Sequence, residues 1–433
     1  MIKITFDGKP VLDKNKSGIG WYSRNLIHQL LKSEEFECHM NYFTSGLSSE
    51  GKEEIKKLKA EGMKLHKIEN KSSILTNALL VFGYPYRKYF GEKTDVMQFF
   101  NYFVPRSVNG KKVTIIHDMV IYDHPETVRF RTMLYLKLGL KKSVKRADLI
   151  ITDSYFSKER ILKHLKVKEE KIRVIHPCID YEVFNKKNAH SVYVEAAESA
   201  ESVQSKKDKR VQSEEAEIVQ QIRKKYSLKE KYMLYLGTLE PRKNIKRLIL
   251  AYSHLVEKNA VPPELVIAGG KGWKYQDIYK TIKEKNLESR VKILGYVEEK
   301  DAPVIMGNAM FFVFPSMYEG FGMPPVEALA CGTPVMAGNA ASLPEALEEN
   351  AHYVDPFSVK SIYKGLKYML ENYESLRKEL LEKNLTGFFE KYDSKKTVKS
   401  YEEIYREMFL VKLETKSNVK LETKSNVKTR NKK

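Results

Sequence analysis

The stretch EGFGMPPVEALACGTPV (319–335) decides the fold of the second half of this 433-residue chain, because it places a glycine loop between a strand and a helix. The apolar run Ala309–Phe314 before it is typical of a buried strand. Gly320 and Gly322 provide a loop whose backbone amides can approach a ligand, and the adjacent proline pair predicts a helix start. Unpaired N–H groups and the helix dipole favour an anion there. The stretch therefore predicts a phosphate site.

Two glutamates belong to the same stretch, Glu319 at the loop entrance and Glu327 in the first turn of the expected helix. Carboxylates would repel a phosphate, so we expect them to accept hydrogen bonds from hydroxyl groups beside it. A ligand that carries hydroxyl groups on both sides of a diphosphate is a nucleotide sugar. The alternative is a surface loop with two solvated acidic side chains.

This arrangement resembles the E-x7-E motif of the retaining glycosyltransferases of family 4, which have the GT-B fold. The resemblance implies that Glu319 contacts the transferred sugar and that Glu327 holds the ribose of the donor nucleotide. It also implies that Gly320, Phe321 and Gly322 line the donor site. The implied fold class is α/β, with two Rossmann-like doubly wound domains that face each other across a cleft.

A second site motif is GTLEPRKN (237–244), which follows an expected strand and opens the next helix. Cations at a helix N-terminus oppose the dipole, so stability alone disfavours Arg242 and Lys243 there. The resemblance implies that Lys243 binds the donor diphosphate, that Arg242 is the second cation and that Gly237 begins the donor loop. Many family members carry an arginine directly after this glycine, where the present chain has Thr238. The alternative is that both cations cap a solvated helix start.

Fixed cations stabilise the charge that a departing nucleoside diphosphate gains, and they do so without a metal ion. We therefore expect no metal ligands in the site, no divalent requirement and no cofactor, the nucleotide sugar being a substrate. The resemblance further implies that Gly295, Tyr296 and Val297 line the base pocket. Gly18 and Gly20, in a loop between the first strand and the first helix, are similar to the family's phosphate or acceptor loop.

His117 and Asp118 end the expected strand Val113–Ile116, at the sheet edge where such sheets bind ligands. A histidine at this position in similar enzymes lies near the anomeric carbon, so the resemblance implies a catalytic role for His117. Either its ring hydrogen-bonds the transferred sugar, or its backbone carbonyl supports the partial positive charge. The alternative is that the two residues cap the next element. Ser154 fits a helix cap as well as it fits a ligand contact.

Alternating strand-like and helical segments divide the chain into two α/β halves. We predict an acceptor-binding domain at 1–184 and a nucleotide-sugar-binding domain at 227–390. The segment 185–226 is rich in Glu, Lys, Ser and Ala, which indicates a charged, solvated insertion that is partly helical or disordered. Residues 391–410 have the spacing of an amphipathic helix, and the resemblance to the GT-B fold implies that this helix crosses back to the first domain. Residues 411–433 carry a tandem octapeptide, VKLETKSN, and are expected to form a disordered basic tail.

The net charge of +20 and the isoelectric point of about 9.4 favour an anionic partner. The sequence has no zinc-ligand spacing and no aromatic RNA-binding signature, so we expect no specific nucleic acid. The aromatic and basic tract at 77–90 and the basic stretch Val128–Lys145 together predict docking on an anionic membrane surface. The alternative is a core-facing apolar stripe with a solvated basic face.

The location of the protein is indicated by three further features. No apolar run approaches the roughly 20 residues of a membrane span, and the chain enters directly into a strand-like segment without a signal peptide. Three widely spaced cysteines, Cys38, Cys178 and Cys331, form no metal-ligand pattern. These features predict a reduced, cytoplasmic protein, and the basic charge predicts that it is peripheral on the inner face of the cell membrane.

The resulting hypothesis is a retaining hexosyltransferase that moves a sugar from a nucleoside-diphosphate sugar, with GDP-mannose favoured. The expected acceptor is a glycan or a lipid-linked glycan in polysaccharide biosynthesis. Two alternatives are an inactive GT-B-like scaffold that binds anionic lipid or nucleic acid, and a sugar-nucleotide epimerase. Intact Glu319, Glu327 and Lys243 weigh against a loss of activity.

Overall fold

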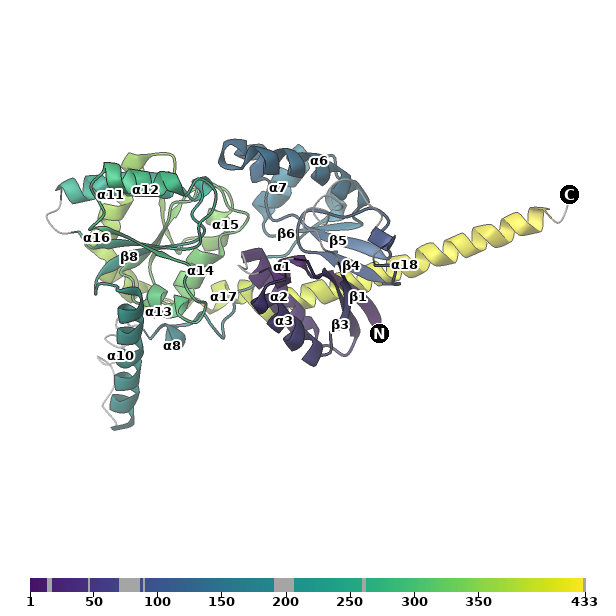
Figure 1. The fold of residues 1–433 in the computed structure, drawn as a ribbon, viewed down its shortest axis with the longest axis horizontal. Coiled ribbons are helices and arrows are strands. Elements are labelled where there is room, and N and C mark those ends of the chain that lie inside the picture. Colours follow the sequence, from purple (N-terminus) through teal and green to yellow (C-terminus); the bar gives the residue numbers. More distant parts are fainter. Residues whose placement is uncertain are drawn as a thin grey trace.

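The chain folds into two α/β domains, each built around one parallel sheet (Figure 1). The computed structural model describes residues 1–13, 18–45, 47–69, 86–88, 90–190, 206–258 and 262–430. Most of the aromatic and basic tract at 77–90 lies outside these residues.

The first domain contains a seven-stranded sheet in the order β3-β2-β1-β4-β5-β6-β7, with every neighbouring pair parallel. Its strands are β1 (Ile2–Asp7), β2 (Phe36–Phe43), β3 (Lys64–Ile68), β4 (Val96–Phe99), β5 (Lys111–Ile115), β6 (Leu149–Thr152) and β7 (Ile172–Val174). Central strands such as β4 and β6 are buried at every residue, because helices cover both faces of a parallel sheet.

Helices cover this sheet on both sides. They are α1 (Lys9–Leu12), α2 (Gly18–Leu30), α3 (Ser49–Ala60), α5 (Val120–Asp123), α6 (Phe130–Arg146) and α7 (Tyr155–His164), with short 3₁₀ turns at Tyr86–Lys88, Pro125–Thr127 and Glu169–Lys171. Ser154 caps α7 by accepting a hydrogen bond from the backbone N–H of Ser157 at 3.0 Å. The expected cap at Ser154 is therefore present.

The second domain repeats the arrangement with six parallel strands in the order β10-β9-β8-β11-β12-β13. These strands are β8 (Tyr232–Leu236), β9 (Glu264–Ala268), β10 (Val291–Gly295), β11 (Phe311–Phe314), β12 (Val335–Gly338) and β13 (His352–Val354). The helices are α11 (Ile245–Lys258), α12 (Gln276–Glu284), α13 (Ala302–Gly307), α14 (Met323–Ala330), α15 (Leu343–Leu347), α16 (Val359–Glu382) and α17 (Thr386–Phe389), with 3₁₀ turns at Pro241–Lys243 and Glu390–Tyr392.

Both strand orders reverse direction beside the first strand of the domain, between β1 and β4 and between β8 and β11. Ligands of doubly wound sheets bind outside the carboxyl ends of the strands at such a reversal. In the second domain, the segments that follow β8 and β11 are GTLEPRKN and the glutamate loop. The topology therefore brings the two site motifs together.

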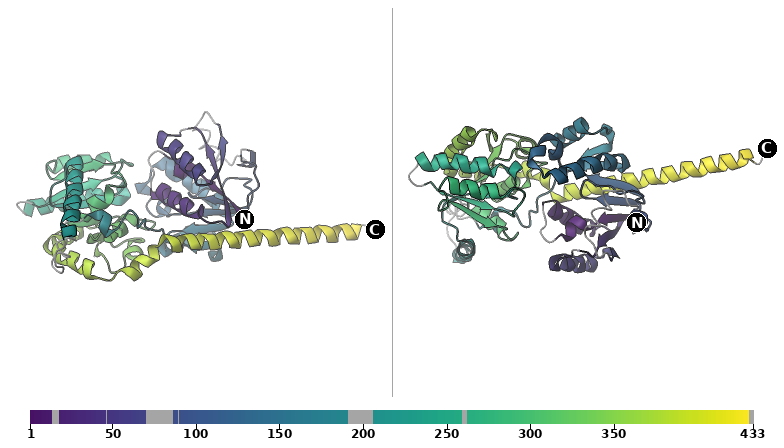
Figure 2. Two further views of the ribbon diagram at one scale, coloured as in Figure 1. Left: turned by 90° about the horizontal axis from the view of Figure 1, so that it is seen from below. Right: turned by 45° about the horizontal axis from the view of Figure 1, so that its top comes forward.

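The segment between the domains contains α8 (Lys186–Ala189) and α10 (Lys206–Tyr226). Its last turn is attached to the second domain, where Lys225 Nζ and Tyr226 OH bind Asp301 Oδ2 at 2.6 Å and 2.7 Å. The buried Val219 and the partly buried Ile222 also belong to this attached part, whereas the beginning of α10 projects away from the second domain (Figures 1 and 2). The charged insertion expected at 185–226 is helical in this part, and its residues 191–205 lie outside the described ones.

The last helix, α18 (Ser394–Arg430), leaves the second domain and packs along the first (Figure 2). Its Tyr401, Ile404, Tyr405 and Met408 belong to the apolar core of the first domain. Tyr405 OH donates to Gln98 Oε1 of β4 at 3.1 Å. Through these contacts, α18 connects the second domain to the first.

The helix continues through Arg430 and so includes the tandem octapeptide, which we expected to be disordered. The repeat contains no glycine or proline and several strong helix formers, so nothing in it ends a helix that tertiary contacts have already nucleated. Among the helices of the described residues, none combines the length and the apolar character that crossing a membrane requires.

Candidate active site

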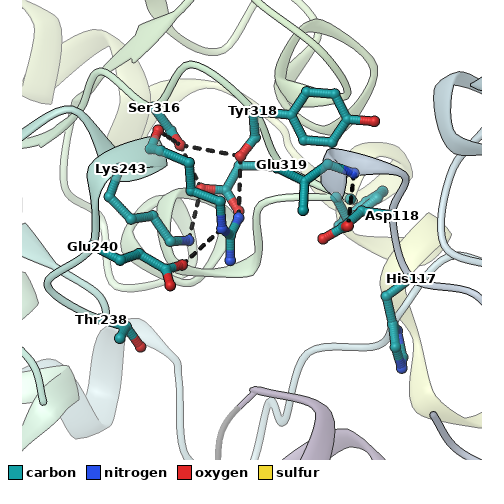
Figure 3. A network of polar contacts seen from close by, with 12 residues as sticks. His117, Asp118, Thr238, Glu240, Lys243, Ser316, Tyr318 and Glu319 are labelled. Carbon is teal, nitrogen blue, oxygen red and sulfur yellow. Dashed lines mark hydrogen bonds and ion pairs between the residues drawn. The ribbon is translucent and has the colours of Figure 1, made fainter. Parts of the chain in front are cut away.

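Glu319 is the centre of a buried charge cluster at the carboxyl edge of the second sheet (Figure 3). Its carboxylate accepts hydrogen bonds from Lys243 Nζ at 2.7 Å, Arg242 Nη1 at 2.8 Å and Ser316 Oγ at 2.6 Å. Burial opposes ionisation, but Lys243 and Arg242 outweigh it and hold the pKa of Glu319 below its usual value. Glu319 is therefore a carboxylate at neutral pH.

Arg242 connects this cluster to a second carboxylate. Its Nε lies 2.7 Å from Glu240 Oε1, and its Nη1 also donates to the backbone carbonyl of Tyr318 at 3.1 Å. Burial opposes its charge, yet Glu319 and Glu240 raise the pKa of Arg242 above its usual value. The structure thus brings together Arg242, Lys243 and Glu319 as the sequence predicts, and it adds Glu240 and Ser316, which the sequence analysis missed.

The position of the two cations follows from the turn Pro241–Lys243 and the residue after it. Asn244 adopts a left-handed conformation with φ of 63°, which asparagine tolerates better than most residues. Its side-chain amide donates to the backbone carbonyls of Pro315 at 2.9 Å and Pro356 at 2.6 Å. These bonds fix the turn against the end of β11, so Lys243 lies directly before α11 and beside Glu319.

The glycine loop provides close contact with the first domain. A side-chain Cβ at Gly320 would lie 2.3 Å from the backbone oxygen of His117. The Gly320 carbonyl accepts hydrogen bonds from Ser154 Oγ at 2.7 Å and Ser157 Oγ at 3.2 Å, both on α7 or its cap. Gly322, with φ of 109°, is the residue before α14 and takes a conformation that favours glycine.

His117 lies across from the charge cluster, and its ring is directed away from Glu319 (Figure 3). Its Nδ1 is 2.7 Å from Asp153 Oδ2, and its Nε2 is 2.8 Å from the carbonyl of Phe100. Both neighbours are acceptors, so both ring nitrogens donate; burial opposes this charge, but Asp153 raises the pKa of His117. Because the ring is engaged, the backbone carbonyl is the atom of His117 that meets the glycine loop. Of the two expected roles, the structure favours the carbonyl.

Glu327 lies in the second turn of α14, one turn later than expected. Burial raises its pKa to about 8, with smaller repulsion from Glu299 and Asp180. Glu327 therefore retains its proton at neutral pH, whereas Glu319, eight positions earlier, does not. A protonated carboxyl can both donate to and accept from a hydroxyl group.

The other predicted donor residues belong to three further segments of the chain. Gly18 and Gly20 form the first turn of α2, and residues 14–17 before them lie outside the described part. Gly237 follows β8 directly, in the motif that carries Lys243. At the end of the edge strand β10, the exposed Tyr296 and the buried Val297 follow Gly295, which has φ of 76°.

Phe321 is buried between the domains, with ring centroids 5.3 Å from His176 and 5.5 Å from Tyr392. Its side chain therefore packs in the interior, and the expected donor contact of this residue is limited to its backbone. Glu345 also joins the domains, since it accepts hydrogen bonds from the backbone N–H groups of Tyr155 at 2.8 Å and Phe156 at 3.0 Å. No sequence signal pairs Glu345 with a helix start in the other domain.

Two models of known protein families match the chain. Residues 218–384 match the family model described as glycosyl transferases group 1, and residues 18–183 match the model of glycosyltransferase family 4. The chain belongs to this glycosyltransferase family. The two matches coincide with the second and the first domain, and the group 1 match includes Lys243, Glu319 and Glu327.

Curated relatives of this glycosyltransferase include mannosyltransferases. The chain is 31% identical over 262 residues to O-antigen chain mannosyltransferase B of Escherichia coli, which covers 60% of this chain and 61% of that one. It is 28% identical over 254 residues to O-antigen chain mannosyltransferase RfbU of Salmonella typhimurium, covering 58% and 59%. The glycosyltransferase thus matches about three fifths of the length of these relatives, and 31% of the length of another, the serotype-specific mannosyltransferase WbdA of E. coli.

Solved structures show the GT-B fold. Sucrose-phosphate synthase from Thermosynechococcus elongatus superposes with a TM-score of 0.68 at 18% identity, over 95% of this chain and all of that one. HepE from Anabaena, in complex with UDP and glucose, gives a TM-score of 0.66 at 17% identity, over 94% and 100%. The expected fold of two facing doubly wound domains is confirmed.

Proposed function

We propose that this glycosyltransferase is a retaining hexosyltransferase that uses a nucleoside-diphosphate sugar. The observation that carries the proposal is the cluster of Lys243, Arg242 and Glu319, held at the strand-order reversal of the second domain and next to the His117 carbonyl of the first. The two cations suit a diphosphate, and the carboxylate beside them suits the hydroxyl groups of an adjacent sugar. A solvated surface loop would not bury these charges.

Each residue has a role in the proposed reaction. Lys243 and Arg242 stabilise the negative charge that grows on the departing diphosphate. Glu319, which is ionised, accepts hydrogen bonds from hydroxyls of the transferred sugar, and Glu327 binds the ribose. The His117 carbonyl supports positive charge at the anomeric carbon, while the leaving diphosphate accepts the proton of the acceptor. With these cations in place, we expect no divalent metal ion to be required for transfer.

GDP-mannose is the proposed donor. The support is that several curated relatives at 27–31% identity are named mannosyltransferases, among them two O-antigen chain enzymes, whereas one at 28% identity is named an N-acetylgalactosaminyltransferase. The HepE complexes with UDP and UDP-glucose are at 17% identity and carry no argument about the donor. The acceptor proposed from the same relatives is a growing surface polysaccharide, free or linked to a lipid.

A membrane surface is the proposed location of this acceptor, on the cytoplasmic side. The supporting feature is α6, on which Phe130, Leu134 and Leu138 recur every four residues and are 70%, 48% and 60% exposed. The exposed cations on the same helix are Arg131, Lys141, Lys142 and Lys145. Apolar side chains beside Lys and Arg suit the headgroup region of an anionic bilayer. The core-facing stripe that was the alternative is excluded for these three side chains by their exposure.

The donor proposal is tested by thermal unfolding with GDP, UDP and their sugars, for the wild-type chain and Glu327→Ala, with and without EDTA. A ligand at 100 times its Kd stabilises the folded state by about 2.7 kcal/mol. We expect stabilisation by GDP and GDP-mannose that is lost in the variant and insensitive to EDTA. If the folded chain responds to no nucleotide, the inactive scaffold replaces the enzyme. Formation of a new glycosidic bond, as opposed to a new sugar nucleotide, excludes the epimerase.

The membrane proposal is tested by co-sedimentation with vesicles of phosphatidylglycerol or of phosphatidylcholine. The variant carries serine at 130, 134 and 138, and its control carries serine at the exposed Leu410 and Leu413 of α18. We expect the wild type and the control to bind anionic vesicles and the α6 variant to remain in solution. Equal binding by all three proteins would assign membrane contact to another surface.

A further inference from the structure

Two histidines on neighbouring strands of the first domain form a continuous chain with two glutamates. His39 of β2 has Nδ1 2.7 Å from Nε2 of His66 on β3. The other nitrogens of the pair face carboxylates: His39 Nε2 is 3.0 Å from Glu37 Oε1, and His66 Nδ1 is 3.0 Å from Glu92 Oε1. The planes of the two rings differ by 3° and their centroids are 5.0 Å apart, so the rings lie side by side with nitrogens facing.

A count of protons shows that this row of four side chains, Glu37, His39, His66 and Glu92, lacks one proton. Three contacts join the four groups, and each contact needs a cation or a proton between its two electron pairs. Two neutral histidines supply two protons, since each imidazole has one N–H. If those protons face Glu37 and Glu92, the nitrogens of His39 and His66 that face each other both present lone pairs at 2.7 Å.

His39 is 3% exposed, so the two facing nitrogens lie in the interior at the edge of the sheet. A metal cation between the two nitrogens can take the place of the missing proton.

We propose that His39, His66 and Glu92 form a binding site for a divalent transition metal of the zinc class. One ligand atom from each of these residues lies within 4.8 Å of the other two, and Glu92 Oε2 is 4.0 Å from His39 Nδ1. Zinc binds nitrogen at about 2.0–2.1 Å in a tetrahedral site, which sets ligand separations of roughly 3.3 Å. Relative to that separation, the facing nitrogens at 2.7 Å must move apart by about 0.6 Å, and Glu92 Oε2 must approach His39 Nδ1 by about 0.7 Å.

Glu37 completes the arrangement without touching the metal. A carboxylate that accepts the second N–H of a metal-binding histidine fixes its tautomer and orientation, and Glu37 does so for His39. Lys64 pairs with Glu37, and Lys3 Nζ lies 3.1 Å from Glu92 Oε2. Lys3 therefore competes with the metal for Glu92, which makes it a useful probe.

The site is separate from the cleft that binds the donor. His39 and His66 lie within β2 and β3, at one edge of the first sheet, whereas the ligand-binding loops follow the carboxyl ends of the central strands. A metal held here would join β2, the edge strand β3 and the segment before β4. Its role is structural, so transfer itself is still expected to be independent of metal.

The experiment is calorimetric titration of the full, EDTA-stripped and tag-free chain with zinc chloride, followed by thermal unfolding. We expect one equivalent to bind in the wild type, binding at least tenfold weaker in His66→Ala and Glu92→Gln, and tighter binding in Lys3→Met. The control is His28→Ala, because His28 also lies between two glutamates, Glu54 and Glu61, on the same domain. Its zinc affinity is expected to equal that of the wild type.

Two results would overturn the proposal. One is a wild-type chain that binds no stoichiometric zinc; the other is equal zinc binding by His66→Ala and wild type. Circular dichroism of each apo variant verifies that it is folded, and Glu92→Gln keeps the size of the side chain if His66→Ala fails to fold. None of these readouts uses a nucleotide sugar, so they are unaffected if the proposed transferase activity is wrong.

Discussion

The two domains contribute different kinds of atoms to the candidate active site. The second domain presents ionised side chains, with Lys243 and Arg242 on Glu319. The first domain presents backbone and neutral hydroxyl groups: the His117 carbonyl beside Gly320, and serines that bind the Gly320 carbonyl. Charged groups select a ligand, whereas backbone contacts fix how closely the domains approach. Donor binding and domain closure should therefore be separable by mutation.

The largest effect is expected from Lys243→Ala. Removing a buried cation that we propose faces the leaving diphosphate should lower kcat by about 10²–10³-fold and weaken GDP binding. Steady-state kinetics with GDP-mannose and calorimetry with GDP measure both. The control is Lys246→Ala, an exposed lysine on the first turn of α11, which should behave as wild type. An equal loss of kcat in both variants would mean that the effect comes from the loss of positive charge in general and not from the position of Lys243.

Gly320→Ala tests the contact between the glycine loop and the first domain. The added Cβ would lie 2.3 Å from the His117 oxygen, so the domains must move apart. We expect transfer to fall about 10-fold or more, since small misplacements of reacting groups are costly, while the affinity for GDP changes little. Gly387→Ala is the control, because a Cβ at Gly387 would meet no described heavy atom within 4 Å. A Gly320→Ala chain that loses GDP binding would show that the two faces are not separable.

The pH dependence of stability tests the difference in charge between Glu319 and Glu327 of the second domain. The folded-state pKa of Glu327 is about 8, above the usual 4.5, so its contribution to stability is present below pH 4.5 and lost as pH rises through 8. Between pH 5 and 8.5, the free energy of unfolding should fall more in the wild type than in Glu327→Gln. Urea denaturation at several pH values measures this, and parallel curves for the two proteins would contradict the raised pKa.

The smallest effect is expected from Glu345→Gln, which weakens one interdomain contact and leaves the charge cluster intact. Glu345 accepts from Tyr155 and Phe156 backbone groups at the start of α7 and from His176. Replacing charged acceptors by neutral ones costs about 1 kcal/mol, so we expect KM for the acceptor to rise roughly fivefold with unchanged GDP affinity. Unchanged kinetics would show that this contact does not limit closure.

Local signals predicted two strands to within two residues. The apolar runs Val113–Ile116 and Ala309–Phe314 correspond to β5 (Lys111–Ile115) and β11 (Phe311–Phe314). Strands β2, β3, β4, β12 and β13 were not anticipated, because their sequences mix polar and apolar residues or lie among many helix formers. The tail was misjudged for the opposite reason: its polar composition indicated disorder, but a helix that has started continues through good helix formers.

The sequence by itself determined the local geometry of the candidate site in the second domain. A strand, a glycine loop and a helix with Glu319 and Glu327 are local in the chain, and short-range sterics and helix dipoles act on neighbours. The tertiary structure alone decided which charges are compensated. Glu240, Ser316 and His117 acquire their roles only when distant loops meet, and burial separates the pKa of Glu327 from that of Glu319. Burial and long-range pairing depend on the whole fold, so no local pattern can encode them.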